Sequence, residues 1–431
     1  MLRTLFHIPT QIGEVPLFGF GVFFWLWCAG AILFLVLQWK KQGWNRELSS
    51  SLLFLVVVGL VIAFILPAVT KPEGIPVRGY GTMLFIAIVS STALCIFRGR
   101  SRGYSPDTVI SFVFWLCVCG IIGARVFYVV EYWEEFRERV LAGNVGVLFN
   151  VADGGIVVYG SLIGGLIGLV VFTRKHKLPF LATCDLIAPA MMLGLAIGRI
   201  GCLFNGCCYG GHCELPWAVT FPTNSPPYES QVERGEVYGF RVSGDPDRPP
   251  VVLDVRPGSP AGEAGLKKGD VIENLDGFAI RSCRDVSSVL RFQTYPKKAP
   301  VVITTAEGDE IKIPAVPVRP RSLPIHPTQL YSSLNAFAIL LILLAVEGRL
   351  RREGELFCLM LVLYAPMRFI LEIIRTDEAE ALGTSFSISQ NISIAVILGV
   401  VLFWWFYLRK TPPRKHRSVL ARSEEVKVPT G

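Results

Sequence analysis

The sequence predicts an all-α polytopic membrane protein with one small α/β domain inserted between two of its membrane-spanning helices. Of the 431 residues, 52% are hydrophobic and only 18% are charged, and the mean hydropathy is +0.49. That composition is too apolar for an ordinary soluble chain of this length. The apolar residues gather in blocks of about 20, the length that crosses a bilayer as a helix. Residues 216–321 break the pattern with proline, glycine, charge and short alternating segments, which predicts a separate domain.

About nine membrane-spanning helices are expected. They cover residues 18–38, 51–69, 79–97, 108–130, 154–172, 183–203, 330–346, 355–371 and 388–408. Residues 1–74 hold two extra N-terminal helices, and the last seven helices form a core in two parts, 75–215 and 322–410. No cleavable signal peptide is expected, because no small-residue cleavage site follows the first span. Residues 411–431 form a basic tail that is expected to be disordered.

Basic residues follow every second expected span, whereas the loops between them are acidic or mixed. The basic loops contain Lys40 and Lys41; Arg98 and Arg100; Arg174 and Lys175; Arg349 and Arg351; Arg409 and Lys410. The positive-inside rule then predicts an external N-terminus, an external 216–321 domain and a cytoplasmic C-terminus. Because the net charge of +8 is distributed over these loops, no nucleic-acid partner is expected.

The inserted domain contains motifs in a recognisable order. These are VYGFRV (237–242), VRPGSPAGEAGLKKGDVIENLDG (255–277) and SCRDVSSVLRF (282–292). They resemble a PDZ domain, whose aromatic-glycine-hydrophobic loop receives a peptide carboxylate on backbone N–H groups; here the loop is Tyr238, Gly239 and Phe240. The resemblance implies that an extracytoplasmic peptide or protein tail binds by strand addition. The alternative is that the domain only spaces or orients the membrane helices.

Ionisable side chains within or next to the expected spans are costly and usually functional. Those that stand out are Arg125, Arg199, Arg368, Glu372 and Arg375. Arg368 and Glu372 are spaced i, i+4 and are expected to pair on one helix. Arg199 has no partner at i, i+4 spacing, and the glycines that flank it allow a ligand to approach closely. Its planar guanidinium group is suited to a phospholipid phosphate at the membrane edge.

Two further spans open with polar residues. Asp153 is the expected N-cap of the fifth span, with Tyr159 one to two turns further along. His326 precedes the seventh span, close to Gln329 and Tyr331. It is either an ordinary surface histidine or a functional one.

Four cysteines crowd the stretch GRIGCLFNGCCYGGHC (198–213): Cys202, Cys207, Cys208 and Cys213. Their spacing is poor for a zinc site and lacks the C-x-x-C of a redox pair. No metal and no cofactor are therefore expected. A disulfide in an external loop is favoured instead, linking Cys202 or Cys213 to Cys207 or Cys208.

Six motifs occur in one order: GYGTML (79–84), GARVFYV (123–129), DGGIVVYGSLIGG (153–165), GRIGCLFNGCCYG (198–210), HPTQLY (326–331) and YAPMRFILEIIRTD (364–377). In this order they resemble the prolipoprotein diacylglyceryl transferase family of the bacterial cytoplasmic membrane. The resemblance implies transfer of diacylglyceryl from phosphatidylglycerol to the lipobox cysteine of a prolipoprotein, with release of glycerol phosphate. It implies catalytic roles for Tyr80 and Arg199, and lipid-binding roles for Arg125, Arg199, Asn205, Gly210, Arg368 and Glu372. Tyr159 and His326 are further catalytic candidates because of their positions at the starts of two spans.

The chain departs from the family pattern at several positions. Tyr159 replaces a histidine, Cys202 replaces an asparagine, Cys207 replaces a glutamate and Ile325 replaces an arginine. Either the thiol is activated differently, through His326 or water, or the protein is a catalytically altered relative that acts as a PDZ-led scaffold for lipids or peptides. A metal-dependent intramembrane protease is excluded, because no His-Glu-x-x-His motif is present.

Overall fold

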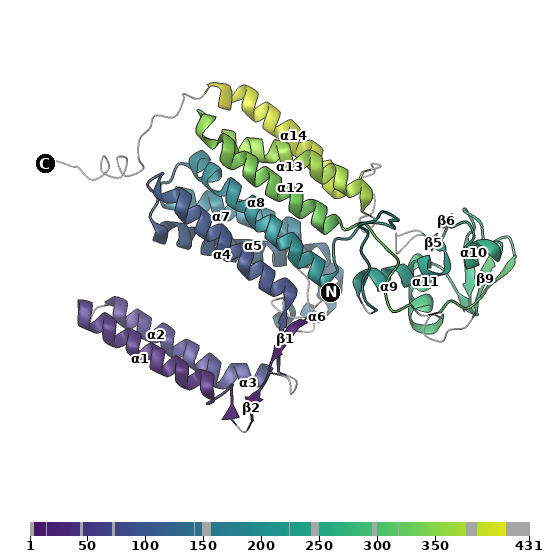
Figure 1. Ribbon diagram of the computed structural model, residues 1–431, viewed down its shortest axis with the longest axis horizontal. Coiled ribbons are helices and arrows are strands. Elements are labelled where there is room, and N and C mark those ends of the chain that lie inside the picture. Colours follow the sequence, from purple (N-terminus) through teal and green to yellow (C-terminus); the bar gives the residue numbers. More distant parts are fainter. Residues whose placement is uncertain are drawn as a thin grey trace. The chain divides into compact units, whose positions relative to one another are not determined.

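A computed structural model (Figure 1) describes residues 4–13, 15–43, 46–70, 74–141, 143–148, 157–223, 225–242, 250–294, 300–317, 319–375 and 386–410. The expected N-cap at Asp153 and the expected disordered tail at 411–431 lie outside these residues. The chain divides into two compact units, Leu2–Thr82 and Met83–Gly431. Each unit is described by itself.

The N-terminal unit combines a helical hairpin with short strands. Its elements are β1 (Thr4–Ile8), β2 (Gln11–Ile12), β3 (Val15–Pro16), α1 (Val22–Gln42), α2 (Arg46–Leu60), α3 (Leu66–Val69) and β4 (Ile75–Arg78). The span expected at 51–69 is helical, but a π-helical turn, Val61–Ile65, interrupts it just before Pro67. Proline has no N–H to donate to the preceding turn, which accounts for the break. The antiparallel pairing of β1 with β4 was not predicted.

The second unit contains the seven core helices, which run side by side in Figure 1. They are α4 (Gly79–Arg100, whose first turn belongs to the N-terminal unit), α5 (Pro106–Glu131), α7 (Val158–Lys175), α8 (Phe180–Asn205), α12 (Thr328–Val346), α13 (Glu355–Ile374) and α14 (Ile388–Phe406). Together with α1, eight helices among the described residues are long and apolar enough to cross a membrane. Large apolar side chains such as Phe97, Phe114 and Leu334 are exposed, as expected for surfaces that face lipid. The chain is a multi-pass membrane protein.

Helices α5 and α7 pack through glycine. A Cβ atom on Gly160 would lie 2.4 Å from the carbonyl oxygen of Gly123, and one on Gly164 would lie 2.2 Å from that of Cys119. Only glycine permits such an approach of two helix backbones, a common packing mode in membranes. The close contact fixes the start of α7, where Tyr159 lies.

Gly164→Ala should therefore destabilise the protein by about 1–3 kcal/mol, because the added methyl group must push the two helices apart. Gly165→Ala is the matched control, since no atom lies within 4 Å of a Cβ at the neighbouring position. Thermal unfolding of the full chain in detergent measures both. Equal melting temperatures for the two variants would contradict the packing described.

One end of the core is held together by buried charge. Arg98 at the end of α4 donates from Nε and Nη2 to Glu347, which follows α12, with N–O distances of 3.1 and 2.9 Å, and Arg102 pairs with the same carboxylate. The Asp185 carboxylate in α8 accepts the backbone N–H groups of Gly354 (2.9 Å) and Phe357 (3.0 Å). It thereby caps the first turn of α13 from a neighbouring helix.

Between α5 and α7, α6 (Trp133–Leu141) and a 3₁₀ turn (Val145–Leu148) form short helical segments that were not predicted. The insertion between α8 and α12 contains α9 (Pro226–Glu233), β5 (Phe240–Val242), β6 (Val252–Val255), α10 (Pro260–Glu263), β7 (Ile272–Leu275), β8 (Phe278–Ala279), α11 (Cys283–Val289), β9 (Val301–Thr305) and β10 (Glu310–Ile313). Its strands form a sheet of order β10-β9-β7-β8 and a separate β5-β6 pair. A buried cluster that includes Tyr238, Leu275 and Ile303 forms its own core, so the expected α/β insertion is present.

Candidate functional site

A network of polar side chains joins three core helices at the end of the bundle opposite the Arg98–Glu347 cluster. Arg368 and Glu372 on α13 form the ion pair that their i, i+4 spacing predicts. Glu372 is only 5% exposed. Arg368 also donates from Nη2 to Ser389 Oγ on α14 (2.8 Å), and that hydroxyl lies 2.8 Å from the Tyr159 hydroxyl on α7. Arg375 extends the network, because its Nη1 lies 3.7 Å from the Glu372 carboxylate.

The loop after α8 is inserted between the start of α12 and the end of α13. Gly210 donates its N–H to His326 O (3.0 Å), Gly211 donates to Ile374 O (2.9 Å), and Gly210 forms an antiparallel bridge with Arg375. A Cβ atom on Gly210 would lie 2.6 Å from His326 Cβ. The absence of a side chain at Gly210 therefore lets the loop after α8 pack closely against the chain at His326, which brings this loop against the ion-pair network.

Arg199 lies in the last two turns of α8. Its charge interacts with Tyr364, Cys202, Cys208 and Arg375, so it is close to the same region as the network. Its Nε atom is buried, and no hydrogen-bond partner for that atom occurs in the described part of the chain. A buried donor without a protein acceptor is costly, which favours an acceptor supplied by a ligand, such as a phosphate oxygen. Asn205, the last residue of α8, lies beside Cys207.

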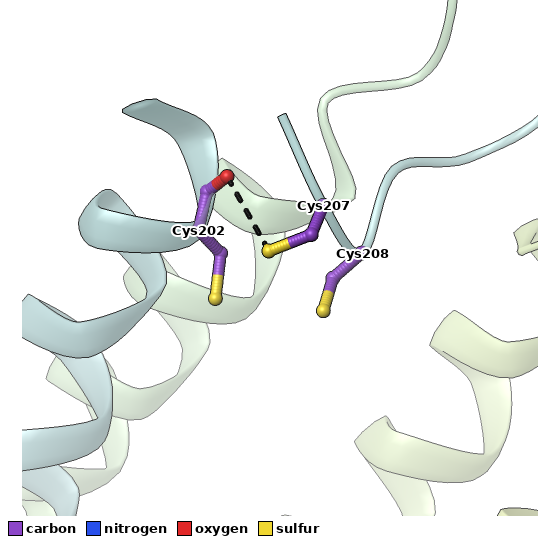
Figure 2. Close-up of side chains that lie close together, drawn as sticks. All are labelled: Cys202, Cys207 and Cys208. Carbon is purple, nitrogen blue, oxygen red and sulfur yellow. Dashed lines mark hydrogen bonds between the residues drawn. The ribbon is translucent and has the colours of Figure 1, made fainter. Parts of the chain in front are cut away.

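The four cysteines of this region carry no disulfide in the structure, although one was favoured from the sequence. The sulfur atoms of Cys202, Cys207 and Cys208 all lie within 4.8 Å of one another, and Figure 2 shows them directed toward a common space. Cys213 is buried outside this group. Hydrogen bonds from the Cys202 and Cys207 thiols, and then the charges of Arg199 and Arg375, lower the pKa of Cys208. Linear spacing had not predicted this cluster.

The His326 ring lies beside Tyr331. Its Nδ1 atom is 3.4 Å from the Tyr331 hydroxyl, which also accepts a hydrogen bond from Trp217 Nε1 (2.7 Å). The His326 backbone exchanges hydrogen bonds with Gly210 and Gly211. His326 is half-buried, and the loop after α8 is its immediate neighbour.

Two further expected site residues lie in other surroundings. Arg125 donates from Nε to Leu148 O (2.7 Å) and from Nη2 to Val147 O (2.9 Å), so it holds the 3₁₀ turn after α6 against α5. This gives it a structural role that the sequence did not predict. Tyr80 is 42% exposed in the first turn of α4 and belongs to the N-terminal unit.

The sequence reasoning missed Ser389 and did not assign Arg375 to the site. Ser389 belongs to the stretch SISQN at 387–391, where Ser387 and Gln390 form a capping box that starts α14. The signal that could have indicated Ser389 is its place among polar residues at the start of an apolar span, which Tyr159 and His326 share. No spacing rule connects Ser389 to Arg368, because the two residues lie on different helices.

The amides of the loop expected to receive a peptide carboxylate form hydrogen bonds within the chain. The N–H groups of Tyr238 and Phe240 donate to Gly235 O (3.0 and 3.4 Å), and that of Gly239 donates to Glu236 O (3.1 Å). All three amides are therefore satisfied within the chain. Gly239 and Phe240 line a cavity of about 280 Å³, whose charged lining residues are Arg241, Arg256, Glu236 and Asp254.

Comparison with known proteins supports the membrane core. The family model described as prolipoprotein diacylglyceryl transferase matches residues 67–406. The phosphatidylglycerol–prolipoprotein diacylglyceryl transferase of Rhodopirellula baltica is 34% identical over 445 residues, covering 92% of this chain and 87% of the relative. Transferase 2 of Clostridium perfringens is 23% identical, with 77% of this chain and 91% of the relative covered. The Synechocystis transferase is 36% identical over 161 residues, which cover 37% of this chain and 55% of the relative.

The family match spans both parts of the core that carry the network, and the first of these relatives aligns across nearly the whole chain. The resemblance inferred from six motifs is thereby confirmed, and the chain belongs to the prolipoprotein diacylglyceryl transferase family.

Proposed function

We propose that this protein transfers diacylglyceryl from phosphatidylglycerol to the lipobox cysteine of prolipoproteins and releases glycerol phosphate. The observation that carries the proposal is the buried Nε atom of Arg199. It has no hydrogen-bond partner among the residues that the structure describes, and it lies near the network of Arg368, Glu372 and Arg375. Such a group of guanidinium ions at one end of a helical bundle is suited to a lipid phosphate. The names of the relatives support the same substrate pair.

In the proposed reaction, the substrate thiol sulfur forms a bond to the terminal glyceryl carbon of the diacylglyceryl group. The bond from that carbon to the phosphate oxygen breaks, and its electron pair leaves on glycerol phosphate. Negative charge grows on the departing phosphate, so cations fixed in a low-dielectric site stabilise the transition state more than the bound lipid. Arg199 is assigned this role, and Arg375 adds positive charge nearby.

The thiol proton needs an acceptor. Tyr159 is a poor candidate, because a tyrosine hydroxyl ordinarily donates a hydrogen bond and seldom accepts a proton. Its hydrogen bond to Ser389, which also accepts from Arg368, gives it a positioning role in the network. His326 is assigned as the proton acceptor, directly or through water, because histidine is a common general base in proteins. Asn205 and Gly210 are assigned to the binding of lipid from their match to the family motifs. Tyr80 is assigned a catalytic role from the GYGTML motif alone, and Arg125 is assigned to support of the 3₁₀ turn at Val145–Leu148.

The proposal is tested with the purified full chain in vesicles. Phosphatidylglycerol carrying a labelled acyl chain and a lipobox peptide are supplied, and labelled peptide and free glycerol phosphate are measured. Labelled peptide and free glycerol phosphate are expected to form in equal amounts. Phosphatidylethanolamine should be a poor donor of the diacylglyceryl group. Retained binding of lipid without any transfer, while an active family member works alongside, would favour the altered scaffold instead.

We further propose a bacterial cytoplasmic membrane location, with the N-terminus and the 216–321 insertion outside and the C-terminus inside. The contact of Arg98 and Arg102 with Glu347 supports this orientation, because it joins the basic loops that follow α4 and α12 on one side. The network around Arg199 then lies toward the outer face, where secreted substrates arrive.

We also propose that the insertion is PDZ-like and binds a peptide tail. The order of its strands and helices supports the resemblance, and Arg241 Nε is buried without a hydrogen-bond partner among the described residues. A carboxylate in the cavity beside Gly239 would be held by Arg241 and Arg256 rather than by the loop amides.

Fluorescent peptides with free C-termini should bind the full chain more tightly than their amidated forms. Arg241→Gln should remove that preference, because it removes one of the two cations beside the cavity. Lys267→Gln, an exposed change in the same insertion, should leave the preference intact. Equal binding of free and amidated peptides by the unmodified protein would refute the proposed carboxylate site.

A further inference from the structure

The three-sulfur cluster at the outer end of α8 is produced by local backbone geometry. Gly206 ends the helix in the left-handed conformation, with φ 77°, and both its N–H and that of Cys207 donate to Cys202 O (2.9 and 3.1 Å). The chain therefore turns back over the last helical turn. Cys208 is one of the few non-glycine residues with positive φ (57°), and this conformation places its sulfur with the other two.

The start of α12 holds this turn in place. Thr328 Oγ1 donates to Cys208 O (2.6 Å), and Gln329 Nε2 donates to Cys207 O (2.7 Å). Both donors are side chains of buried residues. The backbone positions of Cys207 and Cys208 are thus fixed by hydrogen bonds from α12. The cluster therefore does not depend on the conformation of the loop alone.

We propose that Cys202, Cys207 and Cys208 bind a thiophilic metal ion, and that the ion is cuprous copper. Soft thiolate ligands select Cu(I) or zinc. For a metal–sulfur bond of about 2.3 Å, three sulfurs around one ion lie roughly 4.0 Å apart. The observed sulfurs lie within 4.8 Å of one another, so small rotations of the side chains complete the site (Figure 2).

Ligand number and charge favour the cuprous ion over zinc. Structural zinc takes four protein ligands, and the described residues offer only these three sulfurs in the group. Three thiolates around a monovalent ion leave two negative charges. The positive charges of Arg199 and Arg375 both act on Cys208, and together they balance that excess. The three cysteines are half-buried, so an ion has access to them.

The test uses the reduced full chain in detergent under anaerobic conditions, with all 11 thiols counted first. Cuprous ion is delivered from a chromophoric chelator, and zinc is titrated in parallel. One cuprous ion per chain is expected, held at least 100-fold more weakly by the variant Cys202→Ser/Cys207→Ser/Cys208→Ser. Cys213→Ser is the matched control, because Cys213 lies on the same loop outside the cluster, and it should bind as the unmodified protein does.

X-ray absorption of the copper-loaded unmodified protein provides a test that needs no variant. A first shell of three sulfurs is expected. Unchanged copper binding by the triple variant would overturn the proposal, as would a copper shell with fewer than three sulfurs. Zinc binding tighter than cuprous binding would overturn the choice of ion. Because no lipid or peptide is present, these results are independent of the outcome of the transferase assay.

Discussion

Replacing Arg199 with alanine should reduce diacylglyceryl transfer by about 100- to 1,000-fold, the loss typical of removing one donor that stabilises a developing oxyanion. The Nε atom of Arg199 is buried and lacks a hydrogen-bond partner among the described residues. Alanine also removes positive charge close to Cys208 and Tyr364. The effect should appear mainly in kcat, because the interaction strengthens as the phosphate departs.

Two further variants make the result interpretable. Arg199→Lys keeps the charge but loses the planar fork, so it should recover only part of the activity. Arg137→Ala removes an arginine that forms an exposed pair with Glu134 on α6, and it should leave transfer unchanged. Melting temperatures of all variants are compared in detergent. Near-normal transfer by a folded Arg199→Ala protein would exclude the assigned role.

Replacing Glu372 with glutamine should lower the free energy of unfolding by about 3–5 kcal/mol, because it leaves buried guanidinium groups without their counter-ion. Glu372 pairs with Arg368 and lies 3.7 Å from Arg375, and its side chain is nearly inaccessible. Glutamine preserves the size of the side chain while it removes the charge. Loosening of Arg368 should also weaken its hydrogen bond to Ser389 and reduce transfer.

The matched control for this change is Glu134→Gln, which removes a carboxylate from an exposed ion pair with Arg137. It should shift the melting temperature very little. Adding Arg375→Gln to Glu372→Gln should recover part of the lost stability, since one uncompensated charge disappears. A Glu372→Gln protein as stable as the control would show that this carboxylate does not compensate the two guanidiniums.

The transmembrane helices could be predicted well from the sequence. The span expected at 79–97 forms α4 (Gly79–Arg100), and the span expected at 388–408 forms α14 (Ile388–Phe406). A lipid environment forces an apolar segment of this length to satisfy its backbone hydrogen bonds internally, so helix is the outcome. The Arg368–Glu372 pair was predictable for a related reason, because i, i+4 spacing places both side chains on one face.

Short or interrupted elements were not predicted. The β1–β4 pairing joins residues near 4–8 to residues near 75–78, and a strand pair so distant in sequence leaves no local signal. The π-helical turn before Pro67 arises because proline lacks the N–H that would bond to the preceding turn. The apolar pattern of residues 51–69 is that of a continuous helix and does not show how the helix adjusts. The motif of the expected carboxylate loop in the insertion did not indicate that its amides bond within the chain.

By itself, the sequence determined the membrane helices, the family and the pair on α13, because these depend on composition, motif order and spacing within one element. Only the tertiary structure decided which helices supply the rest of the site. Ser389 and Tyr159 meet across α14 and α7, and Cys202 joins Cys207 and Cys208 because Gly206 reverses the chain. Contacts between separate elements depend on packing and on backbone turns, and linear spacing does not encode either of them.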